Sequence, residues 1–500
     1  MAKKYKHLFD TDHVRSDLKQ KSIRGGITTV GSEGLTFILR IGSMAVLARL
    51  LVPAEFGLVS MVTALTGFAQ IFKDLGLSDA TIQNKDIDHE KVSGLFWINS
   101  AIGLLIMLVV AASSPLIAKF YRDPRLSGIA LAISSCFLFS GLTVQHQALL
   151  YRQMRFGQLA LINIISTALS FLVGVVLAWK GYGYWALVIK EISLSAFLAV
   201  GTWLMSGWVP GFPRPGSGVS SLLRFGRDIT GFNIVTYFSR SIDRIFIGRN
   251  WGPAVLGIYD RAMQLMLMPL NQVRFPMTQV GMSGLSALQG NPAKYRQYYS
   301  KLISILCFIY MPMVIYLGLF SRLLIRLVLG DKWIAASDIF RILALAAFIM
   351  PVSSICDLVL ISRGQTKKYF FWGLINTLCI VVAIAIGVKW GSIGVASAYT
   401  IAQYVLFFPS LWNKLAGSPI SVTVFFRSIF SPIIASLFMG ITLVVLSPII
   451  ASLHLINAIG ISFLVGVLTY TGAWFLMPGG KHLLSEYFSY FREIFKISQN

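Results

Sequence analysis

Charge is scarce in this sequence, and negative charge is scarcer still. Only 13% of the 500 residues are charged, and they include 20 acidic residues against 43 lysines and arginines. Soluble domains carry roughly 25% charged residues. Long polar segments are missing as well, because the connections between apolar runs from Gly26 to Phe475 are short. Both shortages exclude a water-soluble protein and leave no room for a soluble domain.

The sequence also lacks the residue spacings of common catalytic and metal sites. Its four cysteines, at 136, 307, 356 and 379, lie inside apolar runs with no C-x-x-C spacing, which excludes a disulfide framework. His146 and His454 are isolated from carboxylates, and no P-loop spacing occurs. We therefore predict no catalytic residue, no metal site and no cofactor. A proton or sodium gradient, or the membrane potential, is the candidate source of energy.

Apolar runs of membrane-spanning length are abundant. The chain is 56% hydrophobic with a mean hydropathy of +0.72, and about fourteen of its runs reach the ~20 residues that cross a bilayer as a helix. Two of them cover 54–80 and 300–329. The predicted fold class is an all-α polytopic membrane protein, with two like-oriented six-helix bundles and two extra C-terminal helices.

The net charge of +23 follows the predicted membrane topology. With the N-terminus in the cytoplasm, the inner loops and tails hold about three times as many lysines and arginines as the outer loops, as the positive-inside rule requires. The charged tail before Arg24 has no apolar core of a secretory signal. Both termini are predicted to be cytoplasmic, and the charge is not a sign of nucleic-acid binding.

One segment of the sequence occurs twice. RLLVPAEFGLV (49–59) returns as RNWGPAVLGIY (249–259), and a shift of 200 residues matches ten positions: 24, 26, 31, 36, 40, 49, 53, 54, 57 and 65. Three of these are arginines and three are glycines, which apolar composition alone does not supply. A looser repeat pairs WKGYGYWALV (179–188) with KWGSIGVASA (389–398). The chain is therefore a duplication with an even number of spans in each copy.

The duplication sets the predicted domain organisation. The Pro-rich stretch SGWVPGFPRPGSG (206–218) separates the copies and is predicted to be a semi-rigid hinge. The predicted segments are a cytoplasmic tail (1–23), an N-terminal six-helix bundle (24–205), a cytoplasmic linker (206–220), a second six-helix bundle (221–413), two additional transmembrane helices (414–477) and a cytoplasmic C-terminal tail (478–500).

Polar residues inside the first span of each copy mark the candidate site. They recur at helical spacing, so each set lies on one helix face. An arginine at mid-membrane costs roughly 2.5–3.5 kcal/mol on insertion scales and normally faces a protein interior or an aqueous cavity. The predicted lining of this cationic cavity is Thr36, Arg40, Asn233, Thr236, Arg240 and Arg244. Because guanidinium matches phosphate oxygens, an anionic headgroup is the expected ligand.

Acidic residues inside the spans are candidates for ion pairing or ion coupling. They are Glu33, Asp243, Glu191 and Asp357. Asp243 lies three residues after Arg240 and beside Arg244, so this trio could instead be a neutralised structural cluster. Arg49 and Arg249 end their helices before Pro53 and Pro253, and for them a structural turn is favoured.

Four motifs in the first half carry a family resemblance: ARLLVPAEFGL (48–58), DLGLSDATIQ (74–83), LLYRQMRF (149–156) and GYGYWAL (181–187). They resemble the polysaccharide transporter family of lipid-linked oligosaccharide flippases, within the multidrug/oligosaccharidyl-lipid/polysaccharide exporter superfamily. The resemblance implies transfer of an undecaprenyl-diphosphate-linked sugar unit from the inner to the outer leaflet of a bacterial cytoplasmic membrane. Exopolysaccharide, capsule and O-antigen are the implied products.

Two other functional classes stay open at this point. A multidrug or cation antiporter would share the fold, but its site should carry excess acid rather than excess arginine. A polysaccharide polymerase or ligase should carry acid and base residues on a sizeable outer loop. The expected partners are the lipid-linked oligosaccharide and membrane lipids, with the polysaccharide polymerase machinery as a candidate and no nucleic acid.

Overall fold

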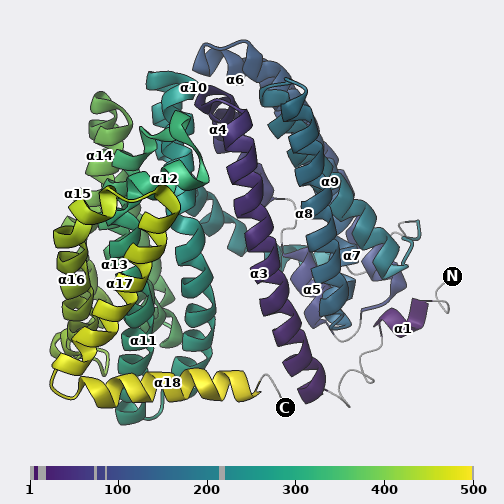
Figure 1. Ribbon diagram of the computed structural model, residues 1–500. Coiled ribbons are helices and arrows are strands. Elements are labelled where there is room, and N and C mark those ends of the chain that lie inside the picture. Colours follow the sequence, from purple (N-terminus) through teal and green to yellow (C-terminus); the bar gives the residue numbers. More distant parts are fainter. Residues whose placement is uncertain (1–4, 10–17, 73–75, 85–86, 213–219, 498–500) are drawn as a thin grey trace. The chain divides into compact units, whose positions relative to one another are not determined.

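The computed structural model describes residues 5–9, 18–72, 76–84, 87–212 and 220–497. For 18–24, 220–240 and 490–497, and for a few single positions, it describes the backbone alone. The chain forms two compact units, Met1–Gly257 and Ile258–Asn500 (Figure 1).

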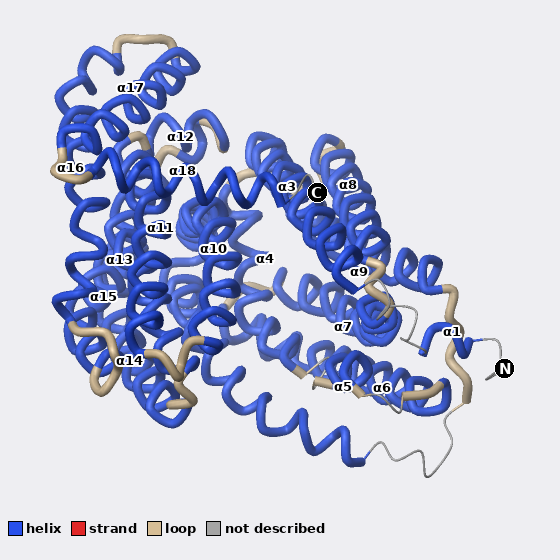
Figure 2. Tube along the Cα trace, turned by 90° about the horizontal axis from the view of Figure 1, so that it is seen from below, coloured by secondary structure: helices blue, strands red, loops and turns tan. Residues whose placement is uncertain are grey.

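Regular structure in the described residues is helical throughout (Figure 2). The first unit holds α1 (Lys6–Phe9), α3 (Leu18–Leu50), α4 (Pro53–Thr66), α5 (Leu77–Gln83), α6 (His89–Tyr121), α7 (Arg125–Arg152), α8 (Phe156–Trp179), α9 (Tyr184–Ser206) and the first part of α10 (Ser220–Ala287). The second unit holds the rest of α10, then α11 (Pro292–Leu319), α12 (Ser321–Val328), α13 (Ala336–Ser362), α14 (Thr366–Gly387), α15 (Gly391–Leu415), α16 (Val422–Ala451), α17 (Leu455–Leu476) and α18 (Gly480–Ile497).

Many of these helices are long and apolar enough to cross a membrane. By length and composition, nine such segments occur among the described residues, and one of them, Thr366–Leu415, contains both α14 and α15. Large apolar side chains remain exposed along them, as on α8 and α16, which suits contact with lipid rather than water. The predicted fold class, an all-α polytopic membrane protein, is confirmed.

The duplicated motif bends the chain at the same point in both copies. In the first copy α3 ends at Leu50, and Val52 is extended before Pro53 starts α4. In the second copy the break within α10 falls at Gly252, directly before Pro253, with φ 79° and ψ −178°. That φ lies in the region that favours glycine. The sequence repeat thus places a helix break directly before the proline in both copies, although the backbone angles at the two breaks differ.

Helix packing repeats in the two units. In the first unit α6 packs on α7, α7 on α9, and α8 on α9. In the second unit the equivalent pairs α11 with α13, α13 with α15, and α14 with α15 are in contact. The two helices without a counterpart, α16 and α17, join this set through α11 and through each other.

Two predicted spans are wrong in their extent. The single span over 54–80 is interrupted, since α4 ends at Thr66, a 3₁₀ turn follows over Gly67–Ile71, and α5 begins only at Leu77. Gly76, with φ 71°, precedes α5 in a left-handed conformation that a continuous helix does not contain. The span over 300–329 also divides, because α11 ends at Leu319 and the short α12 follows.

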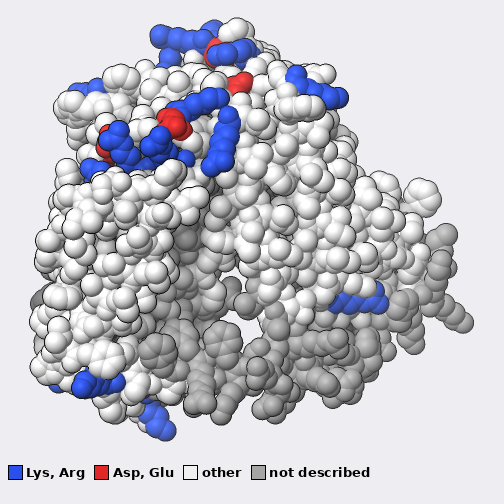
Figure 3. All heavy atoms as spheres, viewed as in Figure 1, with Lys and Arg blue, Asp and Glu red and all other residues white. Residues whose placement is uncertain are grey.

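The C-terminal helix α18 lies across the lower end of the second unit in Figure 1. Its Leu484 and Tyr487 enter an apolar cluster with Trp474 of α17 and Met439 of α16. Glu486 pairs with Lys301 at 2.9 Å. On the visible face of this unit, charged side chains gather near the upper and lower edges with an uncharged band between them (Figure 3). This distribution is expected of a protein with an apolar belt in lipid.

Candidate functional site

Helix α3 exposes apolar side chains on one face. Its exposed apolar side chains include Leu35, Ile38 and Val46. At 100° per residue these lie between about 120° and 160° around the helix from Arg40. Arg40 instead shares its face with the buried Thr36 and with Glu33, and both charged side chains are exposed. Arg40 therefore lies on the side of α3 opposite these exposed apolar residues, on the face that also carries the buried Met44 and Leu47.

The second half of the predicted stripe is described only in part. The side chains of Asn233, Thr236 and Arg240 lie outside the described residues, so their convergence with Arg40 stays a prediction. Asp243 is buried and accepts a hydrogen bond from the backbone nitrogen of Arg244 at 2.8 Å.

The remaining acidic candidates are each paired with a lysine. Glu191 Oε1 lies 2.6 Å from Lys190 Nζ on α9. Asp357 Oδ1 on α13 lies 2.6 Å from Nζ of Lys414 on α15, and Lys414 also donates to Ser353 Oγ at 3.2 Å. Lys414 is buried, and an unpaired charge at a buried position would be destabilising. The ion pair with Asp357 neutralises this charge and links α13 to α15.

A cavity of about 570 Å³ opens in the first unit between α5, α7 and α9. Its lining is mostly small, hydroxyl-bearing or amide-bearing: Ser78, Asp79, Ile82, Cys136, Ser140, Thr143, Val144, Gln147, Ala148, Tyr151, Ser195 and Leu198. The α7 members follow one another at intervals of one, three or four residues, so they share one face of that helix. Sequence reasoning missed this site because it searched the spans for ionisable residues. The signal was present as a helix-period stripe of uncharged polar residues in α7.

Two of the family motifs meet at Arg152, the last residue of α7. This arginine is buried, and its Nη1 donates to the backbone oxygens of Thr81, Ile82 and Asn84 at 2.9, 3.1 and 2.8 Å. Its Nε and Nη2 donate to the carbonyl oxygen of Phe9 at 3.3 and 3.2 Å. One guanidinium thus holds the end of α5 and the N-terminal segment against α7. It acts as a structural clamp, here called the Arg152 clamp.

A buried polar chain runs from α5 through α7 to α6. Thr81 Oγ1 donates to Gln145 Oε1 at 2.7 Å, and Gln145 Nε2 donates to Asn99 Oδ1 at 2.9 Å. All three side chains are fully buried. Since buried polar groups need partners, this chain fixes how the three helices face one another behind the cavity.

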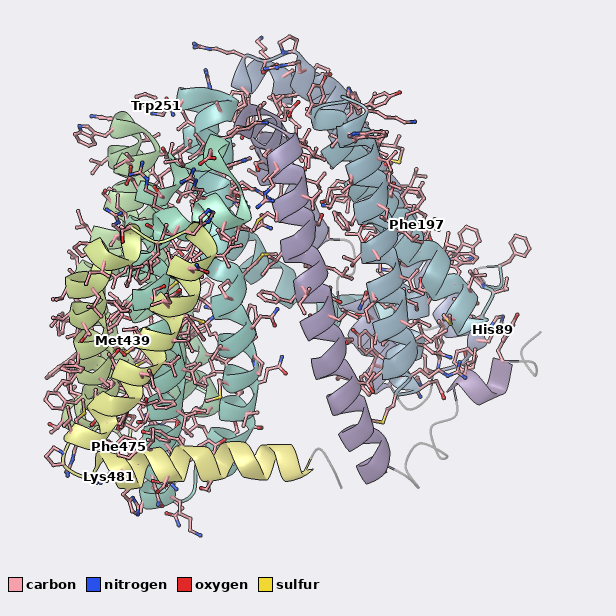
Figure 4. All side chains as sticks on the ribbon, in the orientation of Figure 1. His89, Phe197, Trp251, Met439, Phe475 and Lys481 are labelled. Atoms are coloured by element: carbon pink, nitrogen blue, oxygen red, sulfur yellow. The ribbon has the colours of Figure 1, made fainter. Side chains whose placement is uncertain are left out.

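The start of the predicted hinge is packed on the first unit. Trp208 is buried, and its Nε1 donates to His89 Nδ1 at 3.1 Å. The Gly211 nitrogen donates to Ser93 Oγ at 2.9 Å. His89, beside α1 in Figure 4, also stacks on Tyr5 with ring centroids 5.4 Å apart. The first part of the linker and the N-terminal segment therefore share one docking surface, while 213–219 lie outside the described residues.

The duplicated turns pack against each other inside the first unit. A Cβ atom on Gly57 would collide with the carbonyl group of Pro253, and one on Gly257 with the carbonyl group of Pro53. Glu55 Oε2 accepts a hydrogen bond from the Val52 nitrogen at 2.8 Å, which caps α4. Arg249 lies 5.6 Å from the centre of the Phe120 ring. These contacts support the structural interpretation of the turns and of Arg249.

The turn between α6 and α7 is closed by an exposed ion pair. Asp123 Oδ2 lies 2.7 Å from Arg125 Nη2. Hydrogen bonding to this guanidinium lowers the pKa of Asp123. An exposed pair of this kind contributes little stability, so its role is to shape the turn.

The repeated helix packing and the apolar exterior together define a multi-pass membrane protein built from two duplicated helical bundles. The chain belongs to the family of polysaccharide biosynthesis proteins, whose model matches residues 46–338. The family predicted from the sequence motifs is thereby confirmed.

Known proteins with similar sequence or structure agree with this class. The chain is 29% identical to the teichuronic acid biosynthesis protein TuaB of Bacillus subtilis (strain 168) over 407 residues, which cover 81% of this chain and 84% of the relative. It is 26% identical to the succinoglycan biosynthesis transport protein ExoT of Rhizobium meliloti (strain 1021) over 360 residues, 72% of each. The solved structure of the lipid II flippase MurJ in an inward closed conformation superposes with a TM-score of 0.72 at 15% identity, covering 89% of this chain and 97% of that one.

Proposed function

We propose that this chain is a flippase that moves an undecaprenyl-diphosphate-linked oligosaccharide from the inner to the outer leaflet of a bacterial cytoplasmic membrane. Its product would serve exopolysaccharide, capsule or O-antigen assembly. The proposal rests on the family membership, and on Arg40 as the observation within this chain that bears on the substrate.

Arg40 has a position that suits diphosphate binding. It lies ten residues before the end of α3, about 15 Å along the helix axis, which is close to the middle of a ~30 Å hydrocarbon core. The face of α3 that carries Arg40 is opposite the face with the exposed apolar side chains. A mid-membrane arginine with this orientation is expected to meet water or an anionic ligand rather than lipid tails.

A lipid-linked substrate suits the rest of the chain. The sugar-diphosphate can cross through a polar cavity while its polyprenyl tail stays in the bilayer, so no soluble domain is required. An inside-negative potential favours outward movement of the diphosphate by roughly 2.3 kcal/mol per charge per 100 mV. In this proposal Arg40 and Arg240 bind the diphosphate, both termini are cytoplasmic, and the two bundles alternate access to the site.

Leaflet-resolved labelling of lipid-linked sugars tests the proposal. Deletion of the gene should leave undecaprenyl-diphosphate-linked units on the cytoplasmic leaflet and abolish the surface polymer. If these units reach the outer leaflet normally and only polymerisation fails, the flippase proposal is wrong and an enzymatic role replaces it.

A further inference from the structure

The cavity between α5, α7 and α9 contains neither Arg40 nor Arg240, the residues proposed to bind the diphosphate. Its volume of about 570 Å³ lies within the 300–1,000 Å³ of typical small-molecule sites. Its α7 wall extends from Cys136 to Tyr151, about 22 Å at 1.5 Å per residue. The cavity is therefore long enough for an extended ligand.

The chemistry of the lining is that of a site for uncharged polar groups. Hydroxyls come from all three helices, Gln147 supplies both an amide donor and an acceptor, and Asp79 supplies a carboxylate. Ile82, Val144 and Leu198 add apolar surface, and Tyr151 adds an aromatic ring. Hydroxyl-rich rings with apolar faces need this mixture of hydrogen-bonding groups and apolar surface.

The hydrogen-bonding capacity of the cavity is partly unused. Thr143 and Ser195 donate to backbone oxygens of their own helices, at 2.7 and 3.1 Å. In the part of the chain that the structure describes, the side chains of Asp79, Ser140 and Gln147 have no hydrogen-bond partner. Ser140 and Gln147 are half-buried and Asp79 is exposed, so these groups are open to a polar ligand or to water.

The charge of its lining distinguishes this cavity from the proposed diphosphate site. Of the described residues that line it, none is a lysine or arginine, and Asp79 is the one ionisable carboxylate. A carboxylate without a cation repels phosphate and acidic sugars. A neutral sugar, whose hydroxyls can donate to the carboxylate and accept from the amide, meets no such repulsion.

We infer that this cavity binds neutral sugar rings of the lipid-linked oligosaccharide and thereby contributes to its selection. This inference rests on the proposed flippase function and adds the part of the chain that recognises sugar. Gln147 and Ser140 are the specificity-determining residues, and Asp79 excludes acidic sugars.

Binding measurements on the full chain in lipid nanodiscs test the inference. The two probes are undecaprenyl diphosphate without sugar and the undecaprenyl-diphosphate-linked oligosaccharide extracted from the strain that encodes the chain. Wild type should bind the glycosylated probe about tenfold more tightly. In Gln147→Leu and Ser140→Val this ratio should fall to near one, while affinity for the sugar-free probe stays unchanged. Ser135→Val, on α7 but outside the lining, should keep the wild-type ratio.

A second readout does not depend on substitutions that disturb folding. Cys136 lines the cavity, whereas Cys379 lies exposed on α14. The glycosylated probe should slow alkylation of Cys136 in wild type, measured by peptide-resolved mass spectrometry, and the sugar-free probe should not. Cys379 should react equally with both probes and serves as the internal reference.

The possible results distinguish failure of the sugar-site inference from failure of the proposed flippase function. If wild type binds neither probe, the flippase proposal fails and the inference fails with it. If wild type binds both probes equally, or the variants keep the wild-type ratio and Cys136 stays unprotected, the sugar site is refuted while the flippase proposal stands. If Asp79→Asn abolishes sodium binding and leaves the sugar ratio intact, the cavity is a cation site and the inference is wrong.

Discussion

The carbonyl group of Pro253 occupies the space that a Cβ atom on Gly57 would need, and Pro53 stands in the same relation to Gly257. The two copies of one sequence motif thus contact each other reciprocally, glycine against proline carbonyl. This explains why both copies contain glycine four residues after the proline. Backbone cannot move aside as a flexible side chain can, so the contact tolerates no larger residue.

Gly57→Ala and Gly257→Ala should therefore lower stability, by about 1–3 kcal/mol or more, because the added methyl group overpacks a backbone contact. Thermal unfolding of the purified variants and their abundance in membranes would measure this. Gly34→Ala on α3 is the matched control, since nothing lies within 4 Å of a Cβ atom there. Wild-type stability of Gly57→Ala would contradict the described packing.

Arg40→Ala and Arg240→Ala should abolish transport at normal protein level, because the diphosphate loses its guanidinium partner. Arg40→Lys and Arg240→Lys should keep only part of the transport activity, since lysine keeps the charge and loses the bidentate geometry. A transport assay normalised to membrane protein level measures both effects. Arg49→Ala and Arg249→Ala should instead reduce abundance first. Full transport activity of Arg40→Ala would show that Arg40 does not bind the diphosphate.

Arg152→Lys should destabilise the first unit by about 2–3 kcal/mol, because one ammonium group cannot reach all the carbonyl oxygens that the Arg152 clamp satisfies. Limited proteolysis should then cleave the N-terminal segment faster, since Phe9 loses its bonds to the clamp. Arg155→Lys, three residues beyond the clamp at the start of α8, should change neither measurement. Equal effects of the two substitutions would refute the clamp.

Lys414→Met should reduce abundance because it leaves Asp357 beside α15 without its cation. The double variant Lys414→Met/Asp357→Asn should recover abundance, since no unpaired charge remains. Transport by the double variant then distinguishes the two roles of Asp357. Recovery of transport indicates a structural pair, whereas normal abundance with no transport indicates that Asp357 takes part in ion coupling.

Cysteine labelling in whole cells should find positions 4 and 500 in the cytoplasm and positions 122 and 332 outside. This follows from the excess of lysine and arginine in the predicted inner loops. Position 367, at the start of α14, should be accessible from the cytoplasm. Accessibility of position 367 from outside would overturn the predicted number of spans before it.

The sequence alone determined the membrane class, the duplication and the family. These depend on properties that each segment carries by itself: apolar length, the spacing of Pro53 and Gly57, and the motifs of the first half. The orientation of Arg40 could also be predicted, because helical periodicity relates it to the apolar positions of its own helix.

Only the tertiary structure decided which partners lie across from these residues. Arg152 was one of many basic residues at a predicted inner loop until folding surrounded it with carbonyl oxygens from α5 and from the N-terminal segment. Lys414 on α15 likewise pairs with Asp357 on α13, a contact that the spacing within either helix does not predict. The cavity with Gln147 and Asp79 depends on three helices that meet in space. Periodicity within one helix cannot specify which face of another helix it will meet, and that pairing is decided by packing.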